Sequence, residues 1–372
     1  MKSNYISIVF ISVVLSSSLL VLACTQRVEP ANSTLPGPSP SDVRLVEAME
    51  NVFVDIAHRS KPAIVSITAT DIIRGTEQKP DQHGSGFIFR KDGYIVTNNH
   101  VINGAQLIRV RMFDNRKFIA KLVGGDAGTD IAVLKIESSK ESPTLPFADS
   151  DRVKVGQFAI AIGNPFRLDY TVTTGIVSAK GRSLLPDSDK LIRYQDFIQT
   201  NAWINKGNSG GPLLNIRGEV MGMNAMIRSP DGVPVTAPVR AGAGFAIPIN
   251  QVKKISGQLV AHGKVTRGWL GIRMREAPRG VRVATVFPSS PAKLGGLELR
   301  DVIVEYNGQK IQDGQQLKFL IADSAGEKIE VIVLRRGKRK TLNVTIGEMA
   351  PERMGIETEP QPLKEQPQKE KK

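Results

Sequence analysis

The chain has 372 residues, a formal net charge of +14 and a single cysteine. One cysteine excludes an internal disulfide, a two-cysteine metal site and a CxxC redox pair, and four histidines argue against a multi-histidine metal site. The apolar content of 41% is enough for a packed core, whereas 5% aromatic residues with 34 glycines and 22 prolines favour a turn-rich β protein. At about 100–200 residues per domain, the length predicts two or three domains.

Residues 1–23 have the pattern of a secretory signal peptide. One basic residue, Lys2, precedes a long apolar run, and the small Ala23 precedes Cys24. The residues before Cys24 resemble the lipobox of bacterial lipoproteins, which implies lipidation of that cysteine; simple cleavage and an uncleaved anchor are the alternatives. All three interpretations place the rest of the chain outside the cytoplasm. We expect an extracytoplasmic protein anchored to the membrane, in the bacterial periplasm or cell envelope.

The two ends of the remaining chain are expected to be tethers rather than folded domains. Residues 24–44 are rich in proline, serine and asparagine, and residues 348–372 are rich in proline, glutamine and charge, which predicts a disordered tail. Apolar residues at near-helical spacing predict a helix over 42–59, which Pro62 ends.

Short strands separated by turns follow from residue 63 to about 249. Apolar segments flank Lys91-Asp92-Gly93, a typical hairpin turn. So many evenly spaced strands favour closed barrels or a sandwich over alternating strands and helices. A helix is expected at 249–262, followed by a second domain at 265–347 with a helix at 315–323 and a final hairpin.

Three short segments of the first domain carry residues suited to nucleophilic catalysis: His100 after a strand pattern, Asp130 before one, and Ser209 in a glycine-rich loop. A serine hydroxyl is a weak nucleophile until an imidazole takes its proton, and a buried carboxylate must hold that imidazole in the correct tautomer. Glycines around Ser209 leave the N–H groups of Gly207 and Ser209 available as an oxyanion hole, where each donor contributes roughly 3–4 kcal/mol.

These segments together identify a family. Asp92-Gly-Tyr-Ile-Val-Thr-Asn-Asn-His100-Val, Thr129-Asp130-Ile-Ala-Val-Leu and Gly207-Asn-Ser209-Gly-Gly-Pro-Leu resemble the HtrA/Deg family of trypsin-like serine proteases. The resemblance implies a mainly β, chymotrypsin-like protease domain of two six-stranded barrels at 45–262, with its site in the cleft between them. It assigns His100 as general base, Asp130 as its orienting partner and Ser209 as nucleophile. The α/β-hydrolase elbow is excluded, because Pro212 rather than a helix follows Ser209.

The same resemblance extends to the substrate-binding residues. It implies an oxyanion hole at Gly207, Asn208 and Ser209 and a substrate pocket that includes Trp203, Ile204 and Asn224. In trypsin-like proteases an acidic residue six positions before the nucleophile selects a basic P1 side chain. Here that position is Trp203, so we expect an apolar P1 preference. Two alternatives stay open for Trp203: it narrows the pocket, or it faces the core.

The second domain resembles a small α+β PDZ domain. The resemblance rests on Pro288-Ser-Ser-Pro-Ala, on Asp301-Val-Ile-Val-Glu-Tyr-Asn-Gly and on one further segment. That segment corresponds to the carboxylate-binding loop and comprises Gly268, Trp269, Leu270, Gly271 and Ile272. Such a loop binds the C-terminal carboxylate of a peptide through backbone N–H groups while the peptide adds a strand to the sheet. The helix at 315–323 would form the other wall of the groove.

The family resemblance implies a serine endopeptidase that cuts unfolded or misfolded envelope proteins in a stress response, with the PDZ domain binding exposed C-termini. It also implies a homotrimer, and no metal or organic cofactor is needed. Two alternatives from other classes remain, a chaperone-like binder with an idle triad and a peptide sensor that works through its PDZ domain.

Positive charge is concentrated in the second domain. Residues 265–347 contain 15 Lys and Arg against 8 Asp and Glu, and five of the six residues 335–340 are basic. One interpretation is a solvated hairpin tip. The other is a basic face against anionic lipid. Nucleic acid is not expected as a partner, because no aromatic residues interleave with the basic run.

Overall fold

The structure, a computed structural model, describes residues 39–70, 82–164, 170–183, 194–205, 207–228 and 243–350. The chain divides into two units, residues 1–50 and 51–372. The signal segment, Cys24 and the tail beyond residue 350 lie outside the described residues, so the expectations for them stay predictions. Helix α2 (Pro40–Ser60) begins two residues before the predicted helix and ends one residue after it. Within the described ranges, no helix has the length and apolar character needed to cross a membrane.

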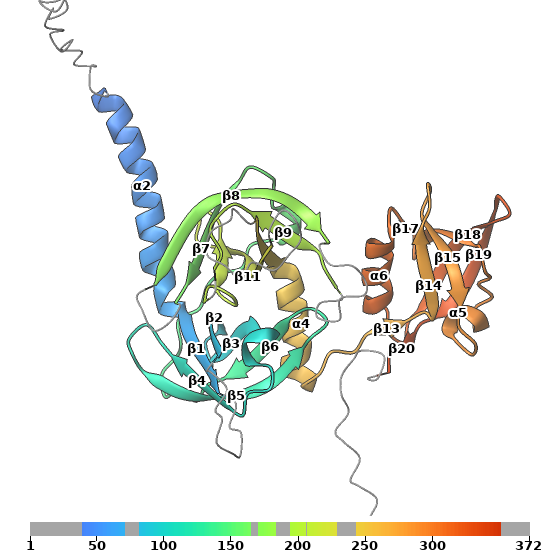
Figure 1. Cartoon of the computed structure of the whole chain (residues 1–372), viewed down its shortest axis with the longest axis horizontal. Coiled ribbons are helices and arrows are strands. Elements are labelled where there is room, and N and C mark those ends of the chain that lie inside the picture. The colour runs from blue at the N-terminus through green and yellow to red at the C-terminus, as the bar shows by residue number, and fades with distance from the viewer. Residues whose placement is uncertain are drawn as a thin grey trace, which may run out of the picture. The chain divides into compact units, whose positions relative to one another are not determined.

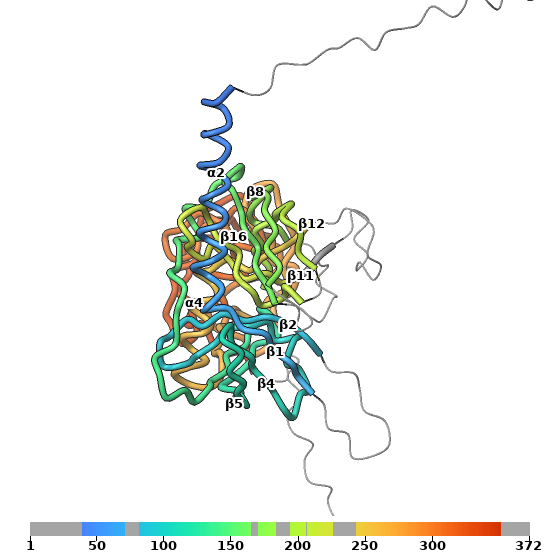
Figure 2. The backbone as a smooth tube through the Cα atoms, turned by 90° about the vertical axis from the view of Figure 1, so that its left-hand side faces the viewer, coloured from blue at the N-terminus to red at the C-terminus, as the bar shows by residue number. Residues whose placement is uncertain are grey.

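The first half of the protease-like region is a closed β-barrel with strand order β1-β2-β3-β6-β5-β4 (Figures 1 and 2). Its strands are β1 (Ile64–Thr70), β2 (Gln82–Arg90), β3 (Tyr94–Asn98), β4 (Leu107–Arg111), β5 (Lys117–Asp126) and β6 (Ile131–Lys135). Short helix α3 (Asn99–Ile102) follows β3 directly. The barrel is filled by aliphatic side chains such as Ile67, Ile88, Ile95 and Leu134, all of them fully buried. Burial of several such side chains, each contributing about 1.5–3 kcal/mol, stabilises the closed form.

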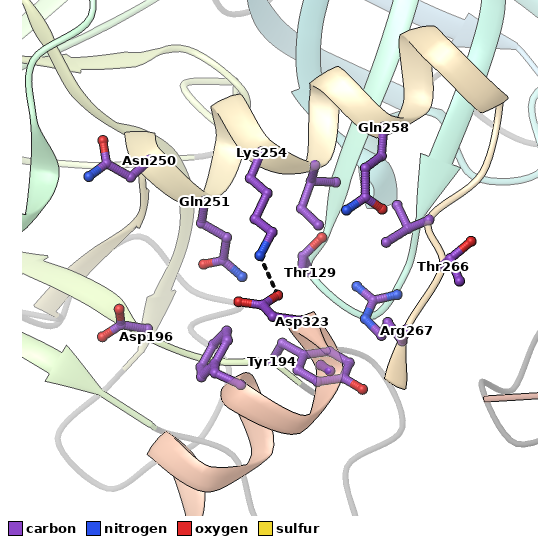
Figure 3. Close-up of a pocket in the computed structure, with 14 residues that line it drawn as sticks. Thr129, Tyr194, Asp196, Asn250, Gln251, Lys254, Gln258, Thr266, Arg267 and Asp323 are labelled. Carbon is purple, nitrogen blue, oxygen red and sulfur yellow. Dashed lines mark ion pairs between the residues drawn. The ribbon is translucent and has the colours of Figure 1, made fainter. Parts of the chain in front are cut away.

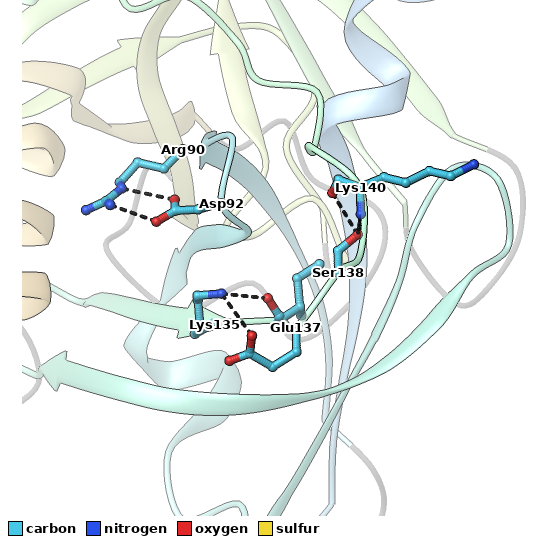
Figure 4. A network of polar contacts seen from close by, with 7 residues as sticks. Arg90, Asp92, Lys135, Glu137, Ser138 and Lys140 are labelled. Carbon is cyan, nitrogen blue, oxygen red and sulfur yellow. Dashed lines mark hydrogen bonds and ion pairs between the residues drawn. The ribbon is translucent and has the colours of Figure 1, made fainter.

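The hairpin that joins β2 to β3 shows how sequence sets local structure. Gly93 has φ of 91°, which L-residues rarely adopt, and its N–H donates to the carbonyl of Arg90 at 3.0 Å. Arg90 donates to both carboxylate oxygens of Asp92 (Figure 4). Its guanidinium also lies over the ring of Tyr94. The predicted turn is therefore present, with its charged side chains paired at the surface.

A second closed barrel has the order β10-β11-β12-β9-β8-β7. Its strands are β7 (Phe158–Gly163), β8 (Thr171–Arg182), β9 (Phe197–Thr200), β10 (Pro212–Leu214), β11 (Val220–Arg228) and β12 (Ala243–Pro248). Helix α4 (Ile249–His262) follows and buries Val252, Ile255 and Leu259 in a core cluster shared by both barrels. Gly263 ends this helix in the left-handed conformation with φ of 71°. The predicted double-barrel, mainly β fold is confirmed.

The remaining chain forms a small α+β domain (Figure 1). Its main sheet has the order β14-β15-β16-β18-β19, with β17 pairing β16, and β13 pairs β20 separately. The strands are β13 (Gly268–Trp269), β14 (Ile272–Glu276), β15 (Val281–Val286), β16 (Val302–Tyr306), β17 (Gln309–Lys310), β18 (Lys328–Arg335), β19 (Lys338–Thr345) and β20 (Gly347–Glu348). Helices α5 (Pro291–Leu294) and α6 (Gly314–Asp323) begin at capping residues Ser290 and Asp313. Leu317 and Ile321 of α6 are buried with Val281, Val283 and Val331 in one core.

Candidate active site

His100 and Asp130 meet at the end of the first barrel. Helix α3 carries His100 directly after β3, and Asp130 lies one residue before β6, which pairs with β3. The His100 ring atom Nδ1 is 2.8 Å from Asp130 Oδ2, and the His100 backbone N–H donates to Oδ1 at 2.8 Å. A carboxylate accepts hydrogen bonds, so Nδ1 carries the proton and Nε2 is left as the basic nitrogen.

Asp130 is held in an unusual backbone conformation. Its φ is 60°, in the left-handed region that costs most residues energy, and the residue is 3% exposed. Its carbonyl accepts from the side-chain amide of Asn98 at 3.1 Å and from the backbone N–H of Asn99 at 3.1 Å. Two donors from the segment before His100 therefore hold the backbone of the residue whose carboxylate faces the imidazole.

The electrostatic environment of His100 favours the imidazolium. Desolvation by the surrounding protein opposes protonation, but the hydrogen bond and the negative charge of Asp130 outweigh it, so the pKa of His100 is raised above its ordinary value of 6.5. A histidine with this environment takes up a proton more readily than a free one, as a general base requires.

The loop around Ser209 is fixed by backbone hydrogen bonds. The Gly210 N–H donates to the carbonyl of Asn224 at 2.8 Å, and the Asn224 N–H donates back to Gly211 at 2.9 Å. Gly207 and Gly210 have φ of 102° and 85°, so a side chain at either position would be strained. The sequence Gly-Asn-Ser-Gly-Gly thus folds into a tight loop that presents Ser209 half-buried.

A serine without an assigned role, Ser85, links this loop to the first barrel. Its hydroxyl is buried and donates to the carbonyl of Gly207 at 2.5 Å while it accepts from the Asn164 N–H at 2.8 Å. The Ser85 N–H also donates to the Ser209 carbonyl at 2.8 Å. The sequence signal is the Gly84-Ser85-Gly86 triplet within β2. A contact between a strand and a loop 122 residues apart leaves no periodicity to detect.

Gly84 brings the two halves of the site together. A Cβ at this position would lie 2.6 Å from a methyl group of Val101, the neighbour of His100, and 3.3 Å from the Ser209 carbonyl oxygen. The nucleophile loop and α3 therefore touch the same point of β2.

Among the described residues, no hydrogen bond joins the Ser209 hydroxyl to His100.

The expected oxyanion donors differ in availability. Within the described ranges, neither the N–H of Gly207 nor that of Ser209 donates to another group. The Asn208 N–H instead donates to the carbonyl of Asn205 at 2.9 Å. The Asn208 N–H is thus paired within its own loop, and the oxyanion role expected of Asn208 stays a prediction.

The predicted pocket residues lie in three different environments. Trp203 is 61% exposed, so of the two alternatives for this residue the core-facing one is wrong. Ile204 is 3% exposed and packs in the core of the second barrel, where it restricts the space beside Gly244. Asn224 is fully buried, and its amide donates to the carbonyl of Pro212 at 3.1 Å.

The predicted carboxylate loop of the C-terminal domain is ordered by its neighbours. Gly268 and Trp269 pair with β20, and the Leu270 carbonyl accepts from the Ala292 N–H at 2.9 Å. Gly271 has φ of 80°, and its carbonyl accepts from Phe287 at 3.0 Å. Ile272 begins β14. These five residues run continuously from β13 into β14, the edge strand of the sheet.

A cavity of about 210 Å³ lies between α4 and α6 (Figure 3). Lys254 of α4 and Asp323 of α6 both line it and form an ion pair of 2.6 Å. Arg267 lines the cavity and is buried against Asp126, which also accepts from the backbone N–H of Thr129 at 3.0 Å. Burial opposes the charge on Arg267, but Asp126 outweighs it and raises the pKa of the guanidinium. Asp126 of this pair lies four residues before Asp130 in the chain.

Comparisons with known proteins agree with this geometry. Residues 84–223 match a trypsin-like peptidase domain and residues 268–346 match a PDZ domain. The chain therefore combines a trypsin-like peptidase fold with a PDZ domain.

The chain belongs to the HtrA/Deg family of serine proteases. It is 44% identical over 289 residues to a probable periplasmic serine endoprotease DegP-like of Marinomonas sp. (strain MWYL1), covering 73% of this chain and 59% of the relative. A protein of the same description from Ectopseudomonas mendocina (strain ymp) is 41% identical over 350 residues, covering 91% of this chain and 70% of the relative. The chain thus spans little more than half the length of the first of these relatives.

Solved structures show the same fold. The HtrA-type protease AlgW with a tripeptide has a TM-score of 0.70 at 37% identity, covering 80% of this chain and 98% of that chain. The serine endoprotease from Yersinia pestis has a TM-score of 0.63 at 35% identity, again covering 80% and 98%.

Proposed function

We propose that this chain is a serine endopeptidase in which His100, Asp130 and Ser209 form the catalytic triad. His100 Nε2 takes the proton of the Ser209 hydroxyl as its oxygen attacks the scissile carbonyl, and Asp130 stabilises the imidazolium. His100 then gives that proton to the leaving amine, and water repeats the cycle to release the acyl group. The observation that carries the proposal is the pair of 2.8 Å hydrogen bonds between His100 and Asp130.

The oxyanion of the tetrahedral intermediate would be held by the N–H groups of Gly207 and Ser209. Preorganised donors of this kind stabilise charge that develops only in the transition state. Ser85 supports this role, because its hydroxyl binds the Gly207 carbonyl and so fixes the orientation of the loop.

We propose an apolar P1 preference for a pocket that includes Trp203, Ile204 and Asn224. None of the three carries a charge that could pair with a basic P1 side chain. The exposed indole of Trp203 is available for contact with substrate.

We propose that the substrates are unfolded or misfolded envelope proteins, with C-termini bound at Gly268–Ile272. Location outside the cytoplasm is supported by the relatives described as periplasmic. Attachment to the membrane through lipidated Cys24, assembly as a homotrimer and a part in the stress response are further components of this proposal. They rest on the signal-like N-terminus and on family membership.

Digestion of an unfolded model protein tests the proposal. The chain should cleave reduced, carboxymethylated lactalbumin after apolar residues, and the Ser209→Ala variant should bind the same protein without cleaving it. Binding without cleavage by both proteins would instead favour the chaperone-like alternative. Cleavage only when a C-terminal peptide is present would assign the sensing role to the PDZ domain.

A further inference from the structure

The basic run at residues 335–340 is a hairpin tip in the folded chain. It joins β18 to β19 through Arg336 and Gly337, which have φ of 50° and 79°. Such a turn reverses the chain within two residues. All of residues 336–340 are exposed, so their charges reach the solvent.

Strand register brings other cations to the same end of this sheet. Across the sheet, Arg275 of β14 lies opposite Arg282, Arg282 opposite Val302, Val302 opposite Leu334 and Leu334 opposite Arg339. This transverse row contains the end of β14, the starts of β15 and β16, and the hairpin tip. We call this region the basic end of the sheet; its exposed cations are Arg275, Arg279, Arg282, Arg300, Arg336, Lys338 and Lys340.

Two arginines brace the backbone at the basic end of the sheet. Arg335 donates to both carboxylate oxygens of Asp301 at 2.8 Å, to Glu298 at 2.5 Å and to the Gly296 carbonyl at 2.7 Å. Arg339 donates to Glu305 at 2.9 Å. These contacts tie the hairpin tip to β16 and to the segment before it, so the exposed cations extend from a braced backbone.

The seven exposed cations lack compensating charge. None of them forms an ion pair with any described residue. The acidic side chains at this end bind Arg335 and Arg339, and Glu276 accepts from the Gly314 N–H at the start of α6. Arg275 and Arg282 are direct cross-strand partners. Like charges directly opposite each other destabilise a sheet, so this arrangement favours an anionic partner.

The composition of the surface distinguishes between anionic partners. Leu299 is 61% exposed beside Arg300, and residues 275–282, 299–302 and 334–340 contain no aromatic side chain. Sequence-tolerant binding of single-stranded nucleic acid uses aromatic stacking, which is missing from these segments. A leucine among arginines instead suits the boundary between phosphate headgroups and acyl chains.

We propose that the basic end of the PDZ sheet docks on an anionic lipid surface. The cations would contact the phosphate headgroups, and Leu299 would enter the interface between them. This role is separate from proteolysis and requires neither Ser209 nor acylation of Cys24, so it can fail or succeed independently of the proposed function.

Vesicle sedimentation with the chain from residue 25 to 372, which keeps every described residue, tests this docking. The protein should bind phosphatidylglycerol vesicles and not phosphatidylcholine vesicles, and high salt should weaken the binding because it screens the charges. The triple variant Arg279→Glu/Lys338→Glu/Lys340→Glu should bind at least about a hundredfold more weakly, since each cation at an anionic surface contributes roughly fivefold.

The matched control reverses three exposed cations elsewhere on the same domain, as Lys293→Glu/Lys310→Glu/Lys328→Glu. Lys310 and Lys328 lie at the opposite end of the sheet, and the control has the same net charge as the test variant. Binding within a fewfold of wild type is expected for the control. Equal losses in both variants, or no binding to phosphatidylglycerol by the wild type, would overturn the proposal. Tighter binding to single-stranded oligonucleotides than to vesicles would also overturn it.

The single variant Arg282→Glu separates docking from folding. A glutamate there faces Arg275 and replaces a repulsive pair by an attractive one, so the melting temperature should stay equal or rise while vesicle binding falls. A fall in melting temperature together with unchanged binding would contradict the proposed role of this pair.

Discussion

Asp130 accepts two hydrogen bonds from His100, one from the ring and one from the backbone, each 2.8 Å long. The two oxygens of one carboxylate therefore fix both the position of the residue and the tautomer of its imidazole. Because Asp130 itself has φ of 60° and is tied through its carbonyl to Asn98 and Asn99, the orienting group is as constrained as the base that it orients.

Asp130→Asn should lower kcat by about 10⁴-fold, because an amide can donate to Nδ1 and so stabilises the wrong tautomer. The midpoint of the acidic limb of kcat/KM should lie above 6.5 in the wild type, since Asp130 raises the pKa of His100. In the variant this midpoint should move to lower pH, because burial alone lowers a histidine pKa. A pH–rate profile with a shared midpoint in both proteins would contradict this assignment.

The same pair should give stability a definite pH dependence. The folded-state pKa of His100 is raised above the unfolded value, so its contribution is fully present below the unfolded pKa and is lost as pH rises through the folded pKa. Thermal melts of wild type and His100→Gln between pH 5 and 9 should therefore converge at the alkaline end. A difference in melting temperature between the two proteins that grows as pH rises would contradict a raised pKa of His100.

Ser85→Ala should slow acylation of Ser209 by roughly 10–100-fold and destabilise the fold by about 1–3 kcal/mol, since it leaves the Asn164 N–H and the Gly207 carbonyl without their partner. Stopped-flow acylation and chemical denaturation measure the two effects. Ser142→Ala is the matched control, because the Ser142 hydroxyl is buried without a hydrogen-bond partner among the described residues. Equal acylation rates in both variants would contradict the role of Ser85 in positioning the Ser209 loop.

Gly84→Ala should destabilise the chain by about 1–3 kcal/mol, because the new methyl group would overlap Val101 and separate α3 from the nucleophile loop. Adding Val101→Ala should restore part of both stability and activity, a non-additive result expected for residues in contact. Gly257→Ala serves as the control, since its Cβ would meet nothing within 4 Å. Additive losses in the double variant would argue against the contact.

Asp126→Ala should cost about 3–5 kcal/mol, because it leaves the guanidinium of Arg267 buried without its partner. The double variant Asp126→Leu/Arg267→Met should recover most of that loss, since apolar residues of similar volume can replace a buried ion pair. Urea denaturation of the three proteins gives the comparison. A double variant less stable than Asp126→Ala would contradict the expectation that apolar side chains can replace this ion pair.

The sequence predicted the features that rest on local pattern. Alternating apolar residues predicted the barrel strands, Gly93 predicted the first hairpin turn, and α4 was predicted with its observed bounds at 249–262. Helix α3, which carries His100, was not predicted, because four residues are too short for helical periodicity.

Contacts between distant segments could not be predicted in the same way. Ser85 belongs to the first barrel and Gly207 to a loop of the second half, so their contact depends on how the two halves pack. The pairing of the Asn208 N–H with Asn205 depends on the conformation of one loop. Exposure of Trp203 likewise follows from how its loop packs, since its type alone allows either a pocket or a core position. The basic character of residues 335–340 was visible in the sequence, whereas the register that places Arg275 and Arg282 beside them was not.

Intact-mass spectrometry after incubation with a fluorophosphonate shows directly whether Ser209 is an activated nucleophile. We expect one adduct per chain, located on Ser209, absent in Ser209→Ala and strongly slowed in His100→Ala. A well-folded wild-type chain that stays unlabelled, or a label that persists on another residue in Ser209→Ala, would contradict it.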